Sequence, residues 1–331
     1  MPASAAKRLL RHYDLHKRTL PWRSANPDPY RVWLSEVMLQ QTTVATVIPR
    51  FGRFIERWPT VEALAAAPLE EVLGEWAGLG YYARARNLHA CAREVAALGA
   101  FPATEAALRK LPGIGAYTAA AIAAIAFGQR ATVVDTNVER VIARLKGIDR
   151  PVAEARAEIH DAAAALTPED RPGDHAQAMM DLGATICRPI KPDCPACPLA
   201  PDCLAFASGT PELFPVPKLK ATRPHRHGVA WWIERDAGVW LVRRPAKGLL
   251  GAMAALPGPD WGEAPPGGPV VATVRHGFTH FTLDLHLVAA AEPPPGEGWW
   301  QAIDGLGSAG LPTLYRRAAD AWLAQRETFA G

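Results

Sequence analysis

The chain has 331 residues, of which 49% are hydrophobic and 21% are charged, and its formal net charge at pH 7 is +3. This length and composition predict a globular protein of two domains, each large enough for its own core. No apolar run reaches the roughly 20 residues that span a membrane, and the basic N-terminus lacks the apolar block of a signal peptide. We therefore expect a cytoplasmic protein with no membrane partner.

Apolar residues recur at helical spacing in the first part of the chain. They predict helices over residues 3–20, 30–48, 60–75 and 86–99. Glu36 lies in the second of these among apolar neighbours, so we expect its side chain to be buried. Burial raises the pKa of a carboxyl group and makes it usable as a general acid near neutral pH. The alternative is a surface glutamate on an amphipathic helix, the more frequent setting for this residue type.

Residues 78–88 combine glycines, two tyrosines and two arginines. An aromatic side chain held on such a turn can wedge into a DNA duplex and fill the gap left by a displaced base. Tyr81 and Arg84 are the candidates for contacts of this kind. The alternative is an ordinary helix cap with packed aromatic residues.

Residues 108–140 form the unit around which the first domain is organised. Pro112, Gly113 and Gly115 interrupt one helix. They leave backbone N–H groups at the start of the next helix, where the helix dipole favours a phosphate. Asp135 follows that apolar helix and precedes another one, so the unit combines a phosphate grip with a carboxylate and indicates chemistry on a nucleic-acid sugar. The alternative is an ordinary helix–turn–helix connection with a capping aspartate.

Four cysteines stand close together near residue 200. They are Cys187, Cys194, Cys197 and Cys203. Prolines between them keep the segment in loops, which allows the thiols to converge on one point. Four thiolates can bind zinc or hold an iron–sulfur cube, and this chemistry alone leaves both open. Disulfides are disfavoured in a cytoplasmic protein.

The composition changes after the cysteines. Residues 211–217 are rich in proline and read as a linker. Strand patterns then appear for the first time, over residues 229–234, 239–243, 270–275 and 281–288. The order of elements predicts an all-α domain followed by a domain that contains a sheet.

Several ordered motifs resemble one family of DNA repair enzymes. The motifs are residues 33–41, 78–88, 111–115, 135–141 and 177–183 and the four cysteines. They are similar to the MutY family of adenine DNA glycosylases, within the helix–hairpin–helix superfamily that also contains endonuclease III, and the resemblance covers nearly the whole chain. It implies one 4Fe–4S cluster on the four cysteines. The implied domains are a helical helix–hairpin–helix catalytic domain with the cluster loop over residues 1–208, a linker over 209–225, and an α+β, Nudix-like lesion-recognition domain over 226–331.

The resemblance implies hydrolysis of the N-glycosidic bond of adenine mispaired with 8-oxoguanine or guanine. The adenine is flipped out of the duplex, Glu36 protonates it at N7, and Asp135 stabilises the oxocarbenium-like sugar or traps it covalently. Asn137 resembles the residue that helps to orient this apparatus. Glycosylases of the family that also nick the strand carry a lysine where this chain has Tyr117, and a tyrosine cannot form their Schiff base. We therefore expect a monofunctional enzyme with Tyr117 beside the scissile sugar.

The resemblance also implies which residues meet the DNA. Gln41 and Tyr81 fill and wedge the site that the flipped adenine leaves, and Trp22, Arg23 and Asp181 resemble residues that line the adenine pocket. The full set of implied DNA contacts is Arg23, Gln41, Tyr81, Arg84, Gly113, Gly115, Phe278, Thr279 and His280.

Phe278, Thr279 and His280 match the family's Phe-Ser-His loop, which contacts 8-oxoguanine. Threonine stands where serine is usual, and it keeps the hydroxyl group. A Nudix hydrolase needs a glutamate-rich helix to hold its metal ions, whereas residues 257–269 are rich in glycine and proline. We therefore expect the second domain to recognise a lesion rather than to hydrolyse a nucleotide.

The expected partner is double-stranded DNA that contains A:8-oxoguanine or A:G mispairs. We expect a monomer, associated with the nucleoid if the source is bacterial. One alternative is a bifunctional nicking glycosylase for oxidised pyrimidines. Another is a non-catalytic iron–sulfur protein that binds lesions, which has no use for Glu36 and Asp135 together.

Overall fold

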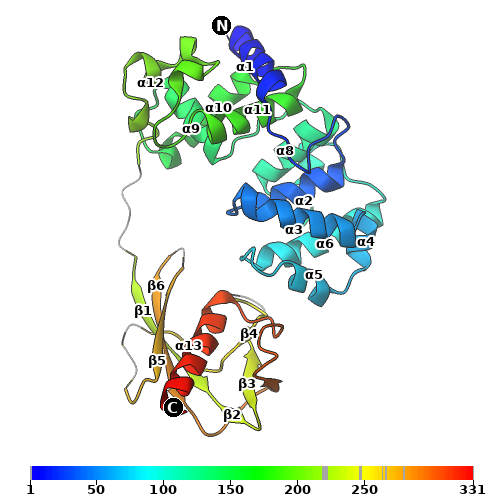
Figure 1. Cartoon of the computed structure of the whole chain (residues 1–331). Helices are drawn as coiled ribbons and strands as arrows, with labels where there is room; N and C mark the ends of the chain where they lie inside the picture. Colours follow the sequence, from blue (N-terminus) through cyan, green and yellow to red (C-terminus); the bar gives the residue numbers. More distant parts are fainter. Residues whose placement is uncertain are drawn as a thin grey trace. The chain divides into compact units, whose positions relative to one another are not determined.

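The computed structural model describes residues 2–217, 223–245, 248–262, 264, 267–278 and 280–330 (Figure 1). The chain divides into two compact units, the first comprising Met1–Leu79 and Arg84–Leu219 and the second the rest of the chain. The division after residue 219 falls inside the predicted linker, while the other proposed domain limits stay predictions. Among the described residues, no helix is long and apolar enough to cross a membrane.

The first unit is helical, as predicted. Its α-helices are α1 (Pro2–His16), α2 (Pro29–Leu39), α3 (Val44–Arg57), α4 (Val61–Ala66), α5 (Leu69–Glu75), α6 (Ala83–Leu98), α7 (Glu105–Leu108), α8 (Ala116–Phe127), α9 (Thr136–Lys146), α10 (Val152–Leu166), α11 (Pro172–Thr185) and α12 (Leu204–Ala207). Helix α8 is apolar on every face and is buried from Thr118 to Ala124. It therefore lies at the centre of the unit and packs against α2, α7 and α11.

Polar side chains fix where several helices begin. Asp28, Thr43, Thr60 and Thr104 each accept a hydrogen bond from a backbone N–H group in the first turn of α2, α3, α4 and α7. Asp135 does the same for α9. Each such cap stabilises its helix by about 1 kcal/mol. The caps set the points at which the chain turns, and so they position residues near the helix ends.

Two predicted helices are each divided in the structure. The segment 30–48 is interrupted because α2 ends at Leu39, Gln41 adopts a positive φ of 57°, and Thr43 starts α3. The segment 60–75 is interrupted at Pro68, which separates α4 from α5. The predicted helix 3–20 ends earlier, at His16. Apolar spacing continues across these points, so periodicity alone joined segments that the backbone separates.

Two glycines let α11 approach its neighbours closely. A Cβ atom at Gly173 would lie 2.5 Å from the Ala124 carbonyl oxygen on α8, and one at Gly183 would lie 2.6 Å from Asn137 Cβ on α9. These distances leave no room for a side chain, so the close packing of α11 depends on glycine at both positions.

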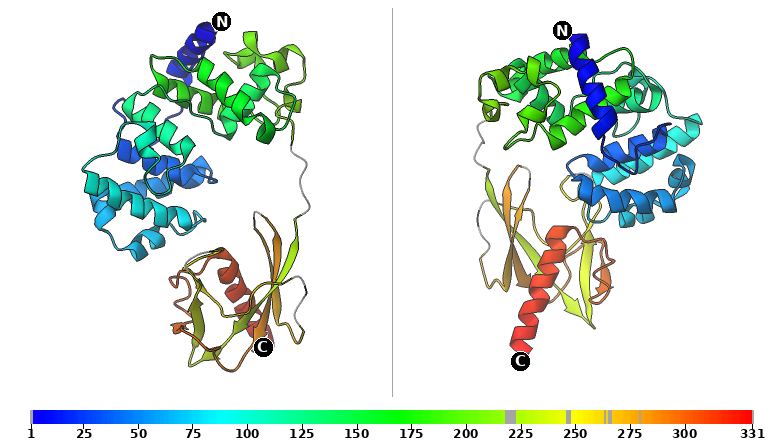
Figure 2. Two further views of the ribbon diagram at one scale, coloured as in Figure 1. Left: turned by 180° about the vertical axis from the view of Figure 1, so that it is seen from behind. Right: turned by 45° about the horizontal axis from the view of Figure 1, so that its top comes forward.

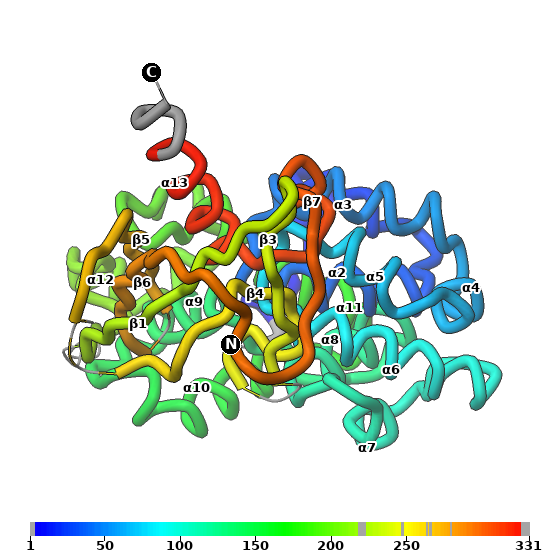
Figure 3. The backbone as a smooth tube through the Cα atoms, turned by 90° about the horizontal axis from the view of Figure 1, so that it is seen from below, coloured from blue at the N-terminus to red at the C-terminus, as the bar shows by residue number. Residues whose placement is uncertain are grey.

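The second unit contains strands and one long helix (Figure 2). Its elements are β1 (His225–Trp232), β2 (Glu234–Arg235), β3 (Gly238–Arg243), β4 (Ala254–Ala255), β5 (Ala272–Gly277), β6 (Thr282–Ala289), β7 (Trp299–Ala302) and α13 (Thr313–Ala330). In one sheet, β6 lies between β1, to which it is parallel, and β5, to which it is antiparallel (Figure 3). In the other, β3 pairs with β2, β4 and β7.

One face of the first sheet forms the core of the second unit. Leu283, Leu285 and Leu287 alternate along β6 and are fully buried, and they belong to the same core cluster as Leu314 and Ala318 of α13. Helix α13 packs on β5 and β6. The intervening residues of β6 point to the opposite face, as the period of a strand requires. The predicted all-α domain followed by an α+β domain is therefore confirmed.

Candidate active site

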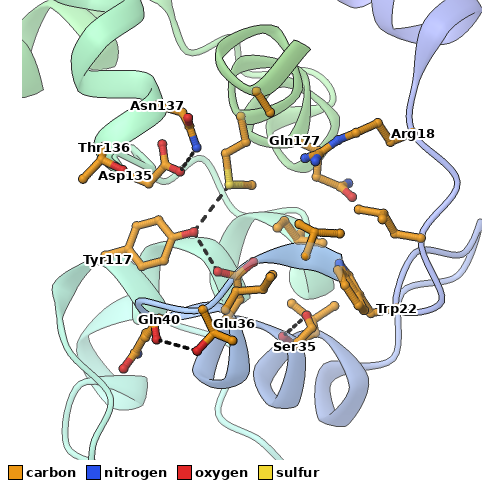
Figure 4. A pocket seen from close by; sticks show the side chains of 18 of the residues that line it. Arg18, Trp22, Ser35, Glu36, Gln40, Tyr117, Asp135, Thr136, Asn137 and Gln177 are labelled. Carbon is orange, nitrogen blue, oxygen red and sulfur yellow. Dashed lines mark hydrogen bonds between the residues drawn. The ribbon is translucent and has the colours of Figure 1, made fainter. Parts of the chain in front are cut away.

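A cavity of about 800 Å³ opens in the first unit (Figure 4). Side chains from α2, α8 and α11 line it, together with the loop before α2 and the connection between α8 and α9. The lining residues that carry polar side chains include Arg18, Trp22, Arg23, Ser35, Glu36, Gln40, Gln41, Tyr117, Asp135, Thr136, Asn137, Glu139 and Gln177. The cavity thus brings together segments that are about a hundred residues apart in the sequence.

Glu36 lies on α2 and is 5% exposed, which confirms that it is buried. Burial is the main cause that raises its pKa to about 7, and the charge of Asp135 raises it further. A hydrogen bond from the Tyr117 hydroxyl to Glu36 Oε2, at 2.7 Å, acts in the opposite direction. Glu36 can therefore hold or release a proton near neutral pH, as a general acid must.

Tyr117 lies on the first turn of α8, between Glu36 and Asp135 (Figure 4). Its hydroxyl also lies 3.4 Å from Met180 Sδ on α11. Burial and the neighbouring Glu36 raise the pKa of the phenol well above its ordinary value. The phenol is therefore a neutral hydrogen-bond donor that fixes one oxygen of Glu36.

Asp135 is the N-cap of α9, and its carboxylate is held by two hydrogen bonds. Oδ1 accepts from the backbone N–H of Val138 at 2.7 Å, and Oδ2 accepts from Asn137 Nδ2 at 2.9 Å. Asn137 is held in turn by Arg140, whose Nη2 donates to Asn137 Oδ1 at 2.9 Å and to the Gly183 carbonyl at 2.7 Å. The carboxylate thus has a fixed direction toward the cavity. Sequence reasoning did not select Arg140, which lies one helical turn after Asn137.

The predicted adenine-pocket residues occupy two layers. Trp22 and Arg23 line the cavity, whereas Asp181 does not. Asp181 lies behind them on α11, where it accepts from Arg23 at 2.7 and 2.8 Å and from Arg18 Nε at 2.6 Å. Asp181 therefore positions two arginines instead of lining the pocket itself. Arg18, which sequence reasoning missed, is a lining residue from the loop after α1.

The predicted DNA contacts of the first domain differ in their surroundings. Gln41 lines the cavity at its positive-φ position, and Tyr81 is 55% exposed. Gly113 has a φ of 73°, and Gly115 begins α8 without any side-chain cap. The first turn of α8 thus lacks a side-chain cap, which is the arrangement that an anion site at a helix start needs, and the binding of a phosphate there stays a prediction.

Arg84 is held by hydrogen bonds within the first unit. Its guanidinium donates to the carbonyl oxygens of Val37 at 2.9 Å, Met38 at 3.1 Å and Leu79 at 2.9 Å. These bonds satisfy the last turn of α2 and join it to the start of α6. The geometry gives Arg84 a structural role, and its contact with DNA stays a prediction.

The four cysteines line one small hollow together with Arg144. Arg144 is 2% exposed, and its Nη1 donates to Cys187 Sγ at 3.3 Å and to the Arg188 carbonyl at 2.7 Å. The four cysteines form no disulfide with one another. Four thiols that line one hollow are ligands that suit a zinc ion or an iron–sulfur cluster.

Comparison with known proteins places this geometry in a family. Residues 34–165 match the family model described as HhH-GPD superfamily base excision DNA repair protein, and residues 228–321 match the NUDIX domain model. The human adenine DNA glycosylase is 35% identical over an alignment that covers 88% of this chain and 69% of that protein. The chain belongs to the adenine DNA glycosylase family. It is therefore a base excision repair enzyme that acts on N-glycosyl bonds.

Other adenine DNA glycosylases are similar over shorter stretches. That of Mycolicibacterium smegmatis is 44% identical over 58% of this chain and 66% of its own length. That of Mus musculus is 48% identical over 60% of this chain and 41% of its own length. The chain thus spans well under half of the mouse relative.

Two solved structures share the helical fold of this adenine DNA glycosylase family member. A thermostable thymine-DNA glycosylase superposes with a TM-score of 0.56 at 29% identity, covering 62% of this chain and 97% of that one. An endonuclease III–DNA complex superposes with a TM-score of 0.52 at 28% identity, covering 62% and 94%. Both matches support the predicted helix–hairpin–helix architecture.

The predicted lesion loop of this glycosylase follows β5. Phe278 stacks on Phe281 with ring centroids 4.7 Å apart and lies 5.5 Å from the ring of Trp261. Its backbone N–H donates to the Phe281 carbonyl at 2.9 Å. His280 is exposed, and Thr279 lies outside the described residues. An aromatic cluster thus anchors one end of the loop.

Proposed function

We propose that the chain removes adenine from double-stranded DNA where adenine is mispaired with 8-oxoguanine or guanine, without nicking the strand. The observation that carries this proposal is the placing of Glu36, Tyr117 and Asp135 in one cavity. It combines a buried carboxyl group whose pKa is about 7 with a second carboxylate held by two hydrogen bonds. Glycoside hydrolysis needs such a pair, one member to donate a proton and the other to stabilise the sugar cation.

The proposed reaction begins when a flipped adenine enters the cavity, at a cost of a few kcal/mol for unstacking. Tyr117 donates to Oε2 of Glu36, which leaves Oε1 as the oxygen that delivers a proton to adenine N7. Protonation makes adenine a better leaving group. Asp135 stabilises the oxocarbenium-like sugar that forms, and Glu36, now ionised, accepts a proton from the attacking water. Asn137 keeps Asp135 directed at the sugar.

The cavity lining supports the proposal that the chain does not nick the strand. A nicking glycosylase attacks the sugar with an amine and forms a Schiff base. Among the described residues that line the cavity, the basic ones are arginines, namely Arg18 and Arg23, and none is a lysine. Tyr117 provides a hydroxyl group, which cannot form that intermediate.

We also propose how the DNA is held. The uncapped start of α8, with Gly113 and Gly115, takes a backbone phosphate. Gln41 and Tyr81 enter the duplex at the position that adenine leaves, and Trp22 and Arg23 contact the flipped base. Phe278, Thr279 and His280 contact 8-oxoguanine. We infer that the chain acts as a monomer in the cytoplasm, at the nucleoid if the source is bacterial.

The residues Cys187, Cys194, Cys197 and Cys203 fit one 4Fe–4S cluster, because all four thiols line one hollow and four thiolates are the ligands of such a cluster. Such a cluster, when bound, supplies a rigid cross-link of the loop after α11. Arg144 donates to Cys187 Sγ and so holds that sulfur in place. Iron and zinc analysis of the purified protein distinguishes the two kinds of site.

The test of the proposed function is single-turnover release of adenine from a duplex with one A:8-oxoguanine pair. Glu36→Gln keeps the size of the side chain and the Tyr117 hydrogen bond but removes the acid. We expect the rate to fall by roughly 10²–10⁴-fold, with duplex binding retained. Glu71→Gln, on the exposed face of α5, is the matched control and should react like the unmodified protein. Adenine release by Glu36→Gln at the rate of the unmodified protein would contradict the role of Glu36 as the acid.

A further inference from the structure

A group of metal-ligating side chains lies in the second unit, outside the cavity described above. His225 and His227 come from β1, and Asp284 and His286 come from β6. The two strands are parallel and in register, with His227 opposite Asp284. Because side chains alternate along a strand, these four project from the face of the sheet opposite its leucine core. We call them the histidine cluster.

The spacing within the histidine cluster suits one metal ion. His225, His227 and Asp284 each offer a ligand atom, and these three atoms lie within 4.8 Å of one another. His225 Nε2 and Asp284 Oδ2 are 3.2 Å apart. Ligand atoms around a tetrahedral zinc ion lie about 3.4 Å apart, given bonds of about 2.1 Å to nitrogen and oxygen. Small side-chain movements are therefore enough to form a coordination sphere.

The other nitrogen of each imidazole already has a partner. His225 Nδ1 lies 2.8 Å from Thr282 Oγ1, and His227 Nδ1 lies 3.0 Å from His286 Nε2. His286 is itself held through its Nδ1, 3.0 Å from Thr273 Oγ1. Metal-binding histidines typically have their second nitrogen oriented by such a hydrogen bond. The arrangement leaves Nε2 of His225 and of His227 as the nitrogens available to a metal.

We propose that His225, His227 and Asp284 bind a divalent transition metal ion of the zinc class. Two imidazoles and one carboxylate are ligands that zinc accepts, and water completes the coordination sphere at this exposed face. His286 is a positioning residue that orients His227. The ion joins β1 to β6 beside the hairpin that carries Phe278 and His280. This inference concerns a separate site and does not rest on the proposed glycosylase reaction.

Arg275 competes with the metal for the carboxylate. Its Nε and Nη2 donate to the two oxygens of Asp284 at 2.8 and 3.0 Å. The carboxylate must therefore be shared with a fixed positive charge, which weakens metal binding. Removing the guanidinium should strengthen it. A purely structural ion-pair network makes no such prediction. An increase in metal affinity on removal of the Arg275 guanidinium would therefore support the metal site.

The experiment is a Zn²⁺ titration of the purified full-length chain by calorimetry at pH 7.5, with zinc and iron measured after dialysis. We expect one zinc per chain. His227→Gln should weaken binding at least about tenfold, and His286→Ala about tenfold, whereas Arg275→Gln should tighten it. His160→Gln removes an exposed histidine from α10 and is the matched control, with unchanged affinity. Circular dichroism verifies that each variant is folded.

Three results would overturn the metal site. One is an unmodified chain that binds no zinc. Another is zinc binding that persists unchanged in His227→Gln, which would locate the ion elsewhere. The iron content measured on the same samples reports whether zinc has entered the cysteine loop instead, and zinc that enters only as iron is lost also contradicts the proposal.

Discussion

At the scale of single residues, the central feature is a glutamate whose pKa the fold brings close to neutral pH. Glu36 is buried, and its pKa of about 7 lies well above that of an exposed glutamate. The proposed reaction uses its protonated form. The single-turnover rate should therefore be constant below pH 7 and fall about tenfold per pH unit above it.

Tyr117→Phe tests this account of the pH dependence. The Tyr117 hydrogen bond lowers the pKa of Glu36, so its loss should raise that pKa and move the alkaline fall in rate to higher pH. The measurement is the single-turnover rate against pH for both proteins, with His160→Gln as a control that leaves the profile in place. A fall that moves to lower pH contradicts the assignment.

His175 makes a second prediction at this scale, about stability. It is 4% exposed on α11, its Nε2 has no hydrogen-bond partner, and burial lowers its pKa to about 4. In the unfolded chain His175 binds a proton below about pH 6.5, whereas in the folded chain it binds one only below about pH 4. The contribution of His175 to the free energy of unfolding is therefore fully present above pH 6.5. It is lost as the pH falls toward 4, and the loss is up to about 3 kcal/mol.

The check on His175 is denaturant unfolding between pH 4.5 and 7.5. His175→Leu removes the titrating group while keeping an apolar side chain of similar reach. The loss of stability on acidification should be smaller in this variant than in the unmodified chain. Equal slopes in the two proteins would exclude His175 as a source of the acid sensitivity.

At the scale of elements, catalytic geometry depends on how closely α11 packs on α9. Gly183 faces Asn137, and an added Cβ would lie 2.6 Å from Asn137 Cβ and 3.2 Å from its backbone. Gly183→Ala should therefore displace the residue that holds Asp135. We expect a loss of about 1–3 kcal/mol of stability and a fall in the single-turnover rate of at least about tenfold.

Gly52→Ala is the matched control for the packing of α11. Gly52 lies inside α3, and a Cβ there meets nothing within 4 Å. Alanine at this position should stabilise the chain by about 0.5–1 kcal/mol and leave the rate unchanged. If Gly183→Ala behaves like Gly52→Ala, the close approach of α11 has no catalytic role.

Patterns along the chain predicted most of the elements but not all of the breaks between them. The apolar residues around Glu36 predicted its burial, and the strands predicted after residue 225 are present. The division of segment 30–48 was not predicted, because Gln41 and Thr43 are ordinary residues within a continuing apolar period. That division also brings Gln41 to the cavity, so the missed break concerns the site itself.

Long-range polar contacts were the other part that the sequence could not reveal. Asp181 was expected to line the pocket, but it holds Arg18 and Arg23 from a loop more than 150 residues away. Arg84 was selected as a DNA contact, and the sequence did not reveal that its guanidinium also holds the end of α2. The direction of a long side chain is set by tertiary neighbours, which local periodicity does not encode.

At the scale of the whole molecule, the chain joins a helical unit that carries the cavity to a Nudix-like unit that carries the predicted lesion loop. Family membership accounts for both units. The central claim is that this chain releases adenine by hydrolysis alone.

Product analysis on one duplex tests that claim most directly. The chain is incubated with DNA that holds a single A:8-oxoguanine pair, in the presence and absence of borohydride. We predict free adenine, an abasic strand that stays intact until treated with base, and no adduct trapped by borohydride. An efficient covalent adduct, or no release of adenine, would contradict the account.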